Sequence, residues 1–340
     1  LKISDLYEEC RNKVKSFINA NHSSEIIFTS GTTASLNDII FGYFKDKLNQ
    51  GDEVIISEAE HAANVLPWFV LAKEKGILLA AHRGACGGNV PCNSLAAFKA
   101  AVNAGADIVE LDVESSSDGE LFIQHPGMER VHLRLADSIK NYPASVVEHF
   151  MLSNSDLAPT QYGIMRFADA LEFLRGKCIV NIDKFWEHPR EIAAIVRRLG
   201  MEDQVFIKTA NRPEYIDDVE RYAPDIPYLT IASSIDTTHE ELKKRSINYQ
   251  GVEALFKTED DMTASKEYID MLHADGKIAF GNAIVFNYKT VLSAGHTDDI
   301  SVTEDPALGW GWLADRGFDV IQTDYTYQCN DYLIKTGRRK

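Results

Sequence analysis

The sequence has 340 residues, 45% of them hydrophobic, and carries 51 acidic against 35 basic side chains, for a formal net charge of −16. This length suffices for one large core with residues to spare, and a field of that sign repels a polyanion, so we expect no nucleic acid partner. No apolar stretch approaches the roughly 20 residues of a membrane span, and the start lacks a basic-then-apolar secretion signal.

The first quarter of the chain predicts a short α/β segment. Apolar periodicity and turn residues place helices over 6–19, 35–48 and 63–75, and strands over 25–29 and 53–57. The character of the sequence changes near residues 76–81, where an apolar run begins.

The remainder alternates strand-length apolar runs with amphipathic stretches. The runs cover 77–82, 108–113, 120–125, 178–183, 204–208, 226–232, 251–256, 277–285 and 319–324. Helical stretches between them cover 94–104, 190–199, 214–223, 239–245 and 266–274. This alternation predicts a parallel sheet covered on both faces, and a span of about 260 residues suits a (β/α)₈ TIM barrel. Nine runs exceed eight barrel strands, so one of them is wrongly assigned.

Polar residues cluster where the first of these runs end. His82 and Arg83 follow the first run, Glu110 and Asp112 lie two apart in the second, and His125 ends the third. Residues two apart on a strand share a face, and carboxylates pointing into a barrel are costly unless they bind a cation or meet water. Barrels place their chemistry at the carboxyl ends of strands. The alternative is a paired polar cluster that serves stability alone.

The segment that carries these residues resembles a known family. AHRG at 81–84, followed by PCNS, GADIVELDV, DG and HP up to residue 126, is similar to the signature of the glycerophosphodiester phosphodiesterases. That signature runs HRG, P-E-N-[ST], GA-[DE]-x-x-E-x-D-V, DG and H-D. VNIDK at 180–184 and GFDVIQTDY at 317–325 fit its later strands. The resemblance implies a phospholipase-C-like phosphodiesterase barrel over residues 80–340.

Roles carried over from the family describe a metal-dependent hydrolase. The resemblance implies that His82 and His125 are the general acid/base pair, and that Arg83 and Lys184 hold the phosphate. It implies one hard divalent ion, Mg²⁺ or Ca²⁺, with three carboxylate ligands: Glu110, Asp112 and Asp183. The expected substrate is a small glycerophosphodiester, cleaved to glycerol 3-phosphate and an alcohol, which would place the protein in glycerol and lipid metabolism.

Three positions depart from the family pattern. Cys92 replaces the metal-binding glutamate, Pro126 replaces the aspartate after the second histidine, and Asp183 directly precedes Lys184. A thiol is a soft ligand that suits neither Mg²⁺ nor Ca²⁺, so Asn93 or water is the candidate for the missing oxygen. These departures leave open a barrel that binds phosphodiesters without hydrolysing them.

Further polar residues near strand ends are secondary candidates. Lys208 could approach the phosphate, against the alternative of a surface lysine whose charge reaches water. Glu253 could contact metal or substrate, against a buried carboxylate paired with a lysine, and Asn282 could line the mouth. The loop with His296, Asp298 and Asp299 precedes Trp310 and Trp312. This loop could be a lid whose aromatic rings contact a choline-like cation. The alternative is a solvated loop followed by two tryptophans that pack in the core.

The five cysteines give no pattern of their own. Cys10, Cys86, Cys92, Cys178 and Cys329 are odd in number, scattered, and free of any CxxC spacing. They predict reduced thiols rather than a disulfide framework or a zinc site, and with them a cytoplasmic protein.

Residues 1–79 resemble a different family. RNKVKSFINA, EIIFTSGTTASLN and GDEVIISEAEHAANVLPW are similar to an internal piece of the cysteine desulfurases, pyridoxal-phosphate enzymes of the class V aminotransferase type. In that family 31–33 would cradle the cofactor phosphate and His61 would stack on its ring. The chain has no His-Lys dipeptide for the Schiff base and no D-x-[AS]-Q segment for the ring nitrogen. We therefore expect a truncated, vestigial fragment, with a pyridoxal-phosphate protein as the alternative.

Overall fold

The computed structural model describes residues 2–29, 31–44, 76–286 and 289–339. The chain divides into two compact units, Leu1–Leu71 and Ala72–Lys340. Among the described helices, none is both long and apolar enough to cross a membrane.

The described part of the first unit is helical. It contains α1 (Lys2–Phe17), a 3₁₀ turn η1 (Ser23–Glu25), α2 (Thr32–Ile39) and a π-helical turn η2 (Ile40–Phe44). The helix predicted over 6–19 is confirmed, and α2 with η2 covers the described part of the one predicted over 35–48. The strand predicted over 25–29 is wrong, because no strand of the described residues pairs with this segment. The other predicted elements, and His61, lie outside the described residues.

The second unit is a closed barrel of eight parallel strands. In order around the barrel they are β1 (Leu78–Ala81), β2 (Ile108–Ser115), β6 (Ile179–Asp183), β7 (Val205–Ala210), β8 (Tyr228–Ser233), β9 (Tyr249–Leu255), β10 (Ile278–Asn282) and β13 (Val320–Thr323). The sheet closes because β1 pairs with β2 on one side and with β13 on the other. The predicted (β/α)₈ barrel is confirmed.

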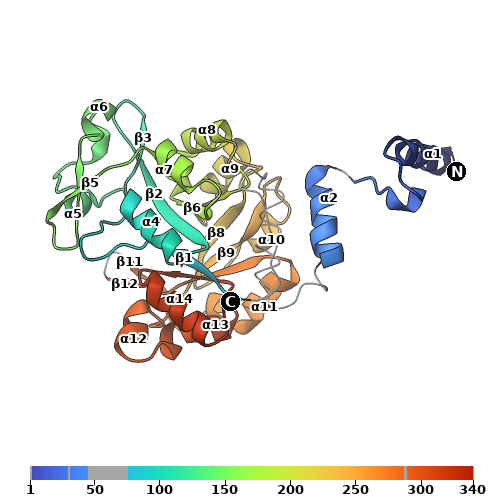
Figure 1. Cartoon of the computed structure of the whole chain (residues 1–340). Coiled ribbons are helices and arrows are strands. Elements are labelled where there is room, and N and C mark those ends of the chain that lie inside the picture. Colours follow the sequence, from blue (N-terminus) through green and yellow to red (C-terminus); the bar gives the residue numbers. More distant parts are fainter. Residues whose placement is uncertain (1, 30, 45–75, 287–288, 340) are drawn as a thin grey trace. The chain divides into compact units, whose positions relative to one another are not determined.

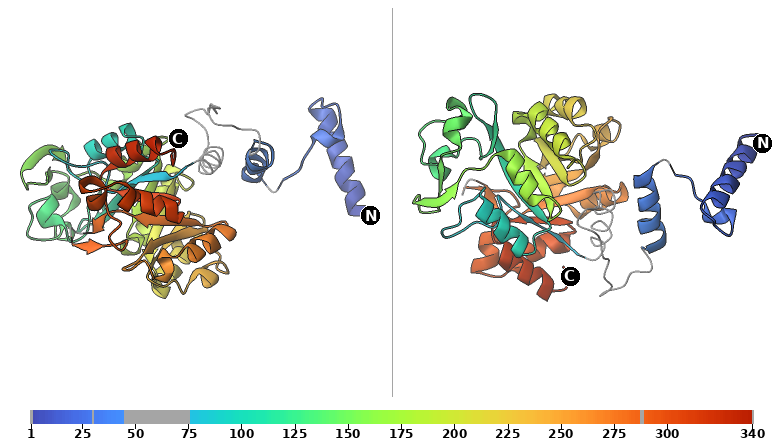
Figure 2. Two further views of the ribbon diagram at one scale, coloured as in Figure 1. Left: turned by 90° about the horizontal axis from the view of Figure 1, so that it is seen from below. Right: turned by 45° about the horizontal axis from the view of Figure 1, so that its top comes forward.

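Helices cover the outside of the sheet (Figures 1 and 2). They are α4 (Leu95–Asn103), α7 (Phe167–Leu174), α8 (Pro189–Leu199), α9 (Pro213–Tyr222), α10 (His239–Leu242), α11 (Lys266–Ala274), α13 (Trp312–Arg316) and α14 (Thr326–Lys335). Each presents an apolar face to the strands; in α8 that face is Ile192, Ala193 and Val196. Five of these helices were predicted, whereas α7, α13 and α14 were not.

The interior of the barrel is apolar at one end and polar at the other. Near the strand starts it is closed by one cluster: Ala80, Ile108, Phe206, Leu229, Phe280 and Val320. Two residues further along several of these strands, the interior positions are polar: His82 follows Ala80, and Glu110 follows Ile108. The apolar layer therefore seals the bottom, and the carboxyl ends of the strands present charged groups.

One of the nine apolar runs is not a barrel strand. The run at 120–125 forms β3 (Leu121–Ile123), which pairs antiparallel with the end of β2, opposing Val113 to Ile123. The turn at 116–119 reverses the chain, with the Ser116 hydroxyl bonded to the Asp118 carboxylate and Gly119 at φ 87°. This hairpin accounts for the ninth run, and His125 therefore reaches the rim from outside the barrel sheet.

An insertion follows β3 and returns to the barrel at α7. It contains α5 (Glu129–His132), η3 (Ile139–Asn141), α6 (Ala144–Val147), β4 (Met151–Ser153) and β5 (Pro159–Gly163), gathered on one side of the barrel in Figure 1. It has its own small core, formed by Phe122, Leu133, Ile139, Ala144, Val147, Leu152 and Ile164. The remaining short elements are η4 (Phe185–Glu187), η5 (Met262–Ala264), β11 (Val285–Phe286), β12 (Thr290–Val291), α12 (Asp298–Thr303) and η6 (Ala307–Gly311).

The expectation of five free thiols is wrong. Cys86 and Cys92, in the loop from β1 to α4, form a disulfide, while Cys10, Cys178 and Cys329 are free. The loop turns back at Gly87 and Gly88, both with positive φ, and brings the two Cα atoms to 4.9 Å. One disulfide between two cysteines six residues apart cannot be predicted from the number and spacing of the cysteines. The cysteines thus no longer argue for a cytoplasmic location.

One glycine sets how closely two barrel strands approach. A Cβ on Gly251 in β9 would overlap the carbonyl oxygen of Ile278 and lie 2.7 Å from its amide nitrogen. Both are backbone atoms and cannot move aside without opening the sheet. We expect Gly251→Ala to lower the free energy of unfolding by about 3 kcal/mol or more. Thermal unfolding monitored by circular dichroism measures this.

Gly163→Ala is the matched control, because a Cβ there meets its nearest atom at 3.7 Å, an ordinary contact. A melting temperature of Gly251→Ala equal to that of the control would contradict the close approach of β9 and β10.

Candidate active site

The centre of the site is a group of three carboxylates on adjacent strands. Glu110 and Asp112 lie on β2, and the β2–β6 register sets Asp112 directly beside Asp183. Glu110 and Asp112 are each only 1% exposed, and one oxygen from each of the three carboxylates lies within 4.8 Å of the others. Three acidic groups predicted from the sequence are therefore brought together at the carboxyl ends of two strands.

Burial and mutual repulsion make it costly for all three carboxyl groups to be ionised at once. Desolvation, followed by the charge of Asp112, raises the pKa of Glu110 to about 7. Burial opposes ionisation of Asp112 as well, but Lys184, His125 and Arg83 hold the pKa of that carboxyl well below its usual range. Likewise, Lys184 and Lys208 lower the pKa of Asp183 to about 2 against the effect of burial.

The donor set fits one hard divalent cation. All three side chains offer carboxylate oxygens, which Mg²⁺ and Ca²⁺ prefer, and they converge on one point. Oδ1 of Asp183 is buried and has no hydrogen-bond partner among the described residues. Glu110, Asp112 and Asp183 are thus the residues that would hold such an ion.

Two predicted lysines lie beside the carboxylates. Nζ of Lys184 is 2.8 Å from Oδ1 of Asp112 and 3.1 Å from Oδ2 of Asp183. Lys208 is 2% exposed, pairs with Glu253, and has its Nζ 3.8 Å from Oδ1 of Asp183. The alternative of a surface lysine is therefore wrong for Lys208.

Glu253 is a buried carboxylate bonded on both oxygens. It accepts hydrogen bonds from Lys208 and from Nδ2 of Asn282, the latter at 2.6 Å. This is the lysine-paired arrangement that the sequence left open for Glu253. Asn282 accepts in turn from Nε2 of Gln322 at 2.7 Å, so it belongs to the polar interior of the barrel.

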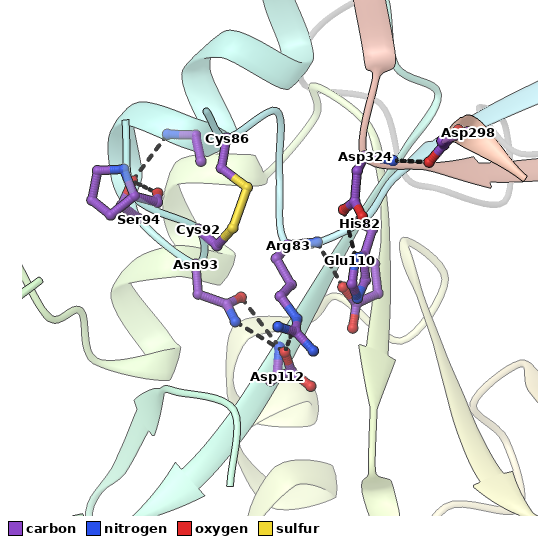
Figure 3. Close-up of a disulfide and its surroundings, with 12 residues drawn as sticks. His82, Arg83, Cys86, Cys92, Asn93, Ser94, Glu110, Asp112, Asp298 and Asp324 are labelled. Carbon is purple, nitrogen blue, oxygen red and sulfur yellow. Dashed lines mark hydrogen bonds and ion pairs between the residues drawn. A yellow bond between two sulfur atoms is a disulfide. The ribbon is translucent and has the colours of Figure 1, made fainter. Parts of the chain in front are cut away.

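His82 is held by an aspartate that sequence analysis did not single out. Its Nδ1 lies 2.8 Å from Oδ1 of Asp324, which follows β13, and β13 pairs with β1 (Figure 3). Burial lowers the pKa of His82, but the charge and hydrogen bond of Asp324, together with the charge of Glu110, outweigh burial, so the pKa is raised overall. The sequence signal was present in the closing strand, GFDVIQTD, as a carboxylate at a strand end.

Asp298 anchors this pair from behind. Its Oδ2 accepts a hydrogen bond from the backbone N–H of Asp324 at 2.8 Å (Figure 3), and its Oδ1 accepts from the Trp310 indole at 2.6 Å and from Thr323 at 2.5 Å. Trp310 is 1% exposed, so its ring is part of the core. Trp312 stacks on His296 with ring centroids 3.7 Å apart. Of the two interpretations of this loop, the structure favours packed tryptophans over an aromatic lid.

His125 reaches the carboxylates from the end of the β3 hairpin. Its Nδ1 is 2.8 Å from the carbonyl oxygen of Pro126, which assigns the proton to Nδ1 and leaves Nε2 as an acceptor. Nε2 lies 4.0 Å from Oδ1 of Asp112. Burial lowers the pKa of His125 to about 4. A backbone carbonyl thus orients the ring where the family pattern has an aspartate.

Arg83, Asn93 and Lys184 support the carboxylates from strained backbone positions. All three have left-handed φ values, between 54° and 57°, a conformation uncommon outside glycine. The Arg83 amide donates to Oε2 of Glu110 at 2.7 Å, and its Nε lies 3.2 Å from Oδ2 of Asp112 (Figure 3). That Nε is buried and is paired with Asp112 by charge, without a hydrogen bond to the described residues.

Cys92 and Asn93 do not supply a further ligand. Figure 3 shows Cys92 bonded to Cys86, so it has no thiolate to offer. Asn93 donates from Nδ2 to Oδ2 of Asp112 at 2.9 Å and accepts from the Asp112 amide at 3.4 Å. Both the nitrogen and the oxygen of its carboxamide thus contact Asp112, and nothing in these contacts supports the suggestion that Asn93 replaces the missing oxygen ligand.

A cavity of about 870 Å³ opens beside these groups. His82 and Arg83 line it on one side, and the disulfide loop, the insertion and the residues after β13 form the other walls. It is large enough for a small organic phosphodiester.

The chain matches two family models. That of the glycerophosphoryl diester phosphodiesterase family covers residues 82–325, and that of the class V aminotransferases covers residues 1–132. Probable cysteine desulfurases of Staphylococcus epidermidis and Staphylococcus aureus are 47% identical over 76 residues, which is 22% of this chain. The match spans 18% of those relatives, so the chain covers less than a fifth of their length.

Solved structures share the barrel. A glycerophosphoryl diester phosphodiesterase from Parabacteroides distasonis superposes with a TM-score of 0.65 at 18% identity, over 82% of this chain and 93% of its own. A glycerophosphodiester phosphodiesterase from Agrobacterium tumefaciens gives 0.55 at 20%, over 75% and 99%. An Oleispira antarctica phosphodiesterase in complex with its product sn-glycerol-3-phosphate gives 0.58 at 18%, over 78% and 99%. At these identities the likeness shows the fold.

The phosphodiesterase family model covers well over half of the chain, from His82 to the residue after Asp324. This chain therefore belongs to the glycerophosphoryl diester phosphodiesterase family of enzymes.

Proposed function

We propose that this enzyme hydrolyses glycerophosphodiesters to glycerol 3-phosphate and an alcohol, using one divalent ion and two histidines. The observation that carries the proposal is the convergence of three buried carboxylates with His125, whose Nε2 is 4.0 Å from Asp112, and with His82, which lies beside Glu110 (Figure 3). The product-bound Oleispira relative supports the substrate class.

The phosphate of the substrate would lie between the carboxylate cluster and Arg83. A chain with net charge −16 needs local cations to hold an anion, and Arg83 and Lys184 supply them. The ion held by the three carboxylates would neutralise charge on the phosphoryl oxygens. This division of roles separates metal binding from phosphate binding.

The hydrogen bonds of the two imidazoles support a different role for each. His125 carries its proton on Nδ1 and has a free Nε2, so it accepts the proton of the nucleophile, either water or the neighbouring glycerol hydroxyl. His82 has its positive form stabilised by Asp324, so it donates a proton to the leaving oxygen. The arrangement resembles the aspartate-oriented histidine of other hydrolases, with Asp324 as the orienting group.

Removal of metal is the first test. We expect EDTA to abolish release of glycerol 3-phosphate from a panel of glycerophosphodiesters, and Mg²⁺ or Ca²⁺ to restore it, because the carboxylate cluster would otherwise be left without its ion. A coupled glycerol 3-phosphate assay measures the release. Binding of the panel without turnover at any concentration of divalent ion would instead identify a non-catalytic phosphodiester-binding barrel.

Loss of either histidine is the second test. We expect His82→Ala and His125→Ala each to reduce kcat by roughly 10² to 10⁴-fold, the usual contribution of a general acid or base. The melting temperature should stay close to that of the parent protein. His149→Ala, an exposed histidine of the insertion, is the control and should leave kcat unchanged. Substantial activity in either site variant would contradict the acid/base assignment.

Asp324 gives a test based on pH. Its carboxylate raises the pKa of His82, so Asp324→Asn should lower that pKa. If His82 acts in its protonated form, the alkaline limb of the profile of kcat/KM against pH moves to lower pH. Asp299→Asn, a nearby exposed carboxylate, should leave the limb in place. An unmoved alkaline limb in Asp324→Asn would show that His82 is not the acid.

We propose that residues 1–79 are a vestige without pyridoxal-phosphate activity. The identity to cysteine desulfurases supports common descent, yet the match spans under a fifth of those proteins, and the sequence lacks the His-Lys and D-x-[AS]-Q motifs. Added pyridoxal phosphate should therefore give no protein-bound aldimine absorbance.

A further inference from the structure

We propose that His132 and Ser153 form a subsite for a hydroxylated head group, so that the enzyme selects phosphodiesters of polyols over those of quaternary amines or plain alkyl alcohols. This inference rests on the proposed hydrolysis of glycerophosphodiesters and names the alcohol class that the site accepts.

Both residues come from the insertion and face the cavity. His132 ends α5 and Ser153 ends β4, and both line the cavity that also contains His82 and Arg83. Their chain neighbours Leu133 and Leu152 are buried in the insertion's own core. The small core therefore fixes the backbone on which the two polar side chains are presented to the cavity.

The polar atoms of both side chains are buried and unpaired. His132 is 6% exposed and Ser153 is 5% exposed. Within the described part of the chain, neither ring nitrogen of His132 nor Oγ of Ser153 has a hydrogen-bond partner. Buried polar groups of folded proteins are almost always paired, because an unpaired one costs free energy. Two such side chains on one cavity wall thus indicate a place where a ligand completes the hydrogen bonds.

The chemistry of the pair matches hydroxyl groups. Desolvation, followed by the charge of Arg83, lowers the pKa of His132 to about 3, so its ring is neutral at pH 7 and offers one donor and one acceptor. Ser153 also donates and accepts. A hydroxyl needs both functions, whereas a trimethylammonium or propyl group offers neither and would leave the pair unsatisfied.

Two other residues that line the cavity offer a chemistry that would favour a different alcohol. Asp299 and Tyr325 are both in the lining, and an acid near an aromatic ring suits a quaternary ammonium. However, Asp299 is exposed and Tyr325 is 37% exposed, so water competes for both. The buried, unpaired groups of the insertion therefore decide in favour of the hydroxylated ligand.

The test compares glycerol 3-phosphate esters of glycerol, 1-propanol and choline. The first two carry the same charge and differ only in two hydroxyls of the alcohol. We expect kcat/KM of the parent enzyme to be at least about tenfold higher for the glycerol ester than for the propyl ester. His132→Phe and Ser153→Ala should each remove about tenfold from the glycerol ester and leave the propyl ester within about twofold.

Two further variants separate recognition from folding. His132→Asn keeps a donor and an acceptor and should recover part of the preference. Ser145→Ala, an exposed serine of the insertion that is not among the residues lining the cavity, should change nothing. If His132→Phe or Ser153→Ala lowers kcat/KM equally for the glycerol and propyl esters, the subsite is overturned. Such a result would indicate that the residue acts in folding or in binding the glycerol 3-phosphate part that both esters share. A parent enzyme that prefers the choline ester would overturn it as well.

Calorimetric binding of the same esters in EDTA distinguishes this inference from the proposed reaction. If the protein hydrolyses none of them yet binds the glycerol ester more tightly than the propyl ester, and His132→Phe removes the difference, the reaction fails and the subsite stands. Equal binding of both esters overturns the subsite whether or not hydrolysis occurs.

Discussion

The confinement of three carboxylates in a buried space is the constraint on which the site depends. Burial, followed by repulsion from Asp112 close by, raises the pKa of Glu110. Lys184 comes from the end of β6 and Arg83 from the end of β1 to offset it. The compensation is incomplete, because Oδ1 of Asp183 is 3.8 Å from Nζ of Lys208 and accepts no hydrogen bond from the described residues. A cluster whose negative charge is only partly neutralised attracts a cation. With a cation bound to the carboxylates, Lys184 and Arg83 are less strongly held by them and can contact an anionic ligand.

Because the barrel is closed, its first strand, β1, and its last strand, β13, are neighbours at this site. β1 carries His82 and β13 carries Asp324, residues 242 positions apart in sequence that meet because the strands are neighbours. Asp298 accepts hydrogen bonds from the Asp324 backbone N–H and from the Trp310 indole N–H, which ties that contact to the core. The orientation of the His82 ring is thus a property of the completed fold. Loss of the last strand would remove it even though every motif residue near the beginning remained.

The difference between what was and was not predicted follows from the range of the interactions. Glu110 and Asp112 lie two apart on one strand, so their shared face could be deduced from sequence. The barrel followed from the repeated strand–helix alternation. The hairpin of β3 was missed because three apolar residues look alike in a barrel strand and in a return strand, and only the turn at Gly119 distinguishes them. The pairing of His82 with Asp324 had no local signature, since it depends on which strands become neighbours.

The loop from β1 to α4 shows how this chain departs from its family without losing the carboxylate cluster. Where the family pattern has a glutamate, Cys92 is joined to Cys86, and the next residue, Asn93, contacts Asp112 through both the nitrogen and the oxygen of its carboxamide. A disulfide therefore occupies the position of that glutamate, next to a residue that holds Asp112 in place. Three protein carboxylates leave most coordination positions of a hard divalent ion to water or substrate oxygens. The same loop and the insertion both line the cavity, so the loop beside the carboxylate cluster also bounds the space where, under the proposal, the substrate alcohol would lie.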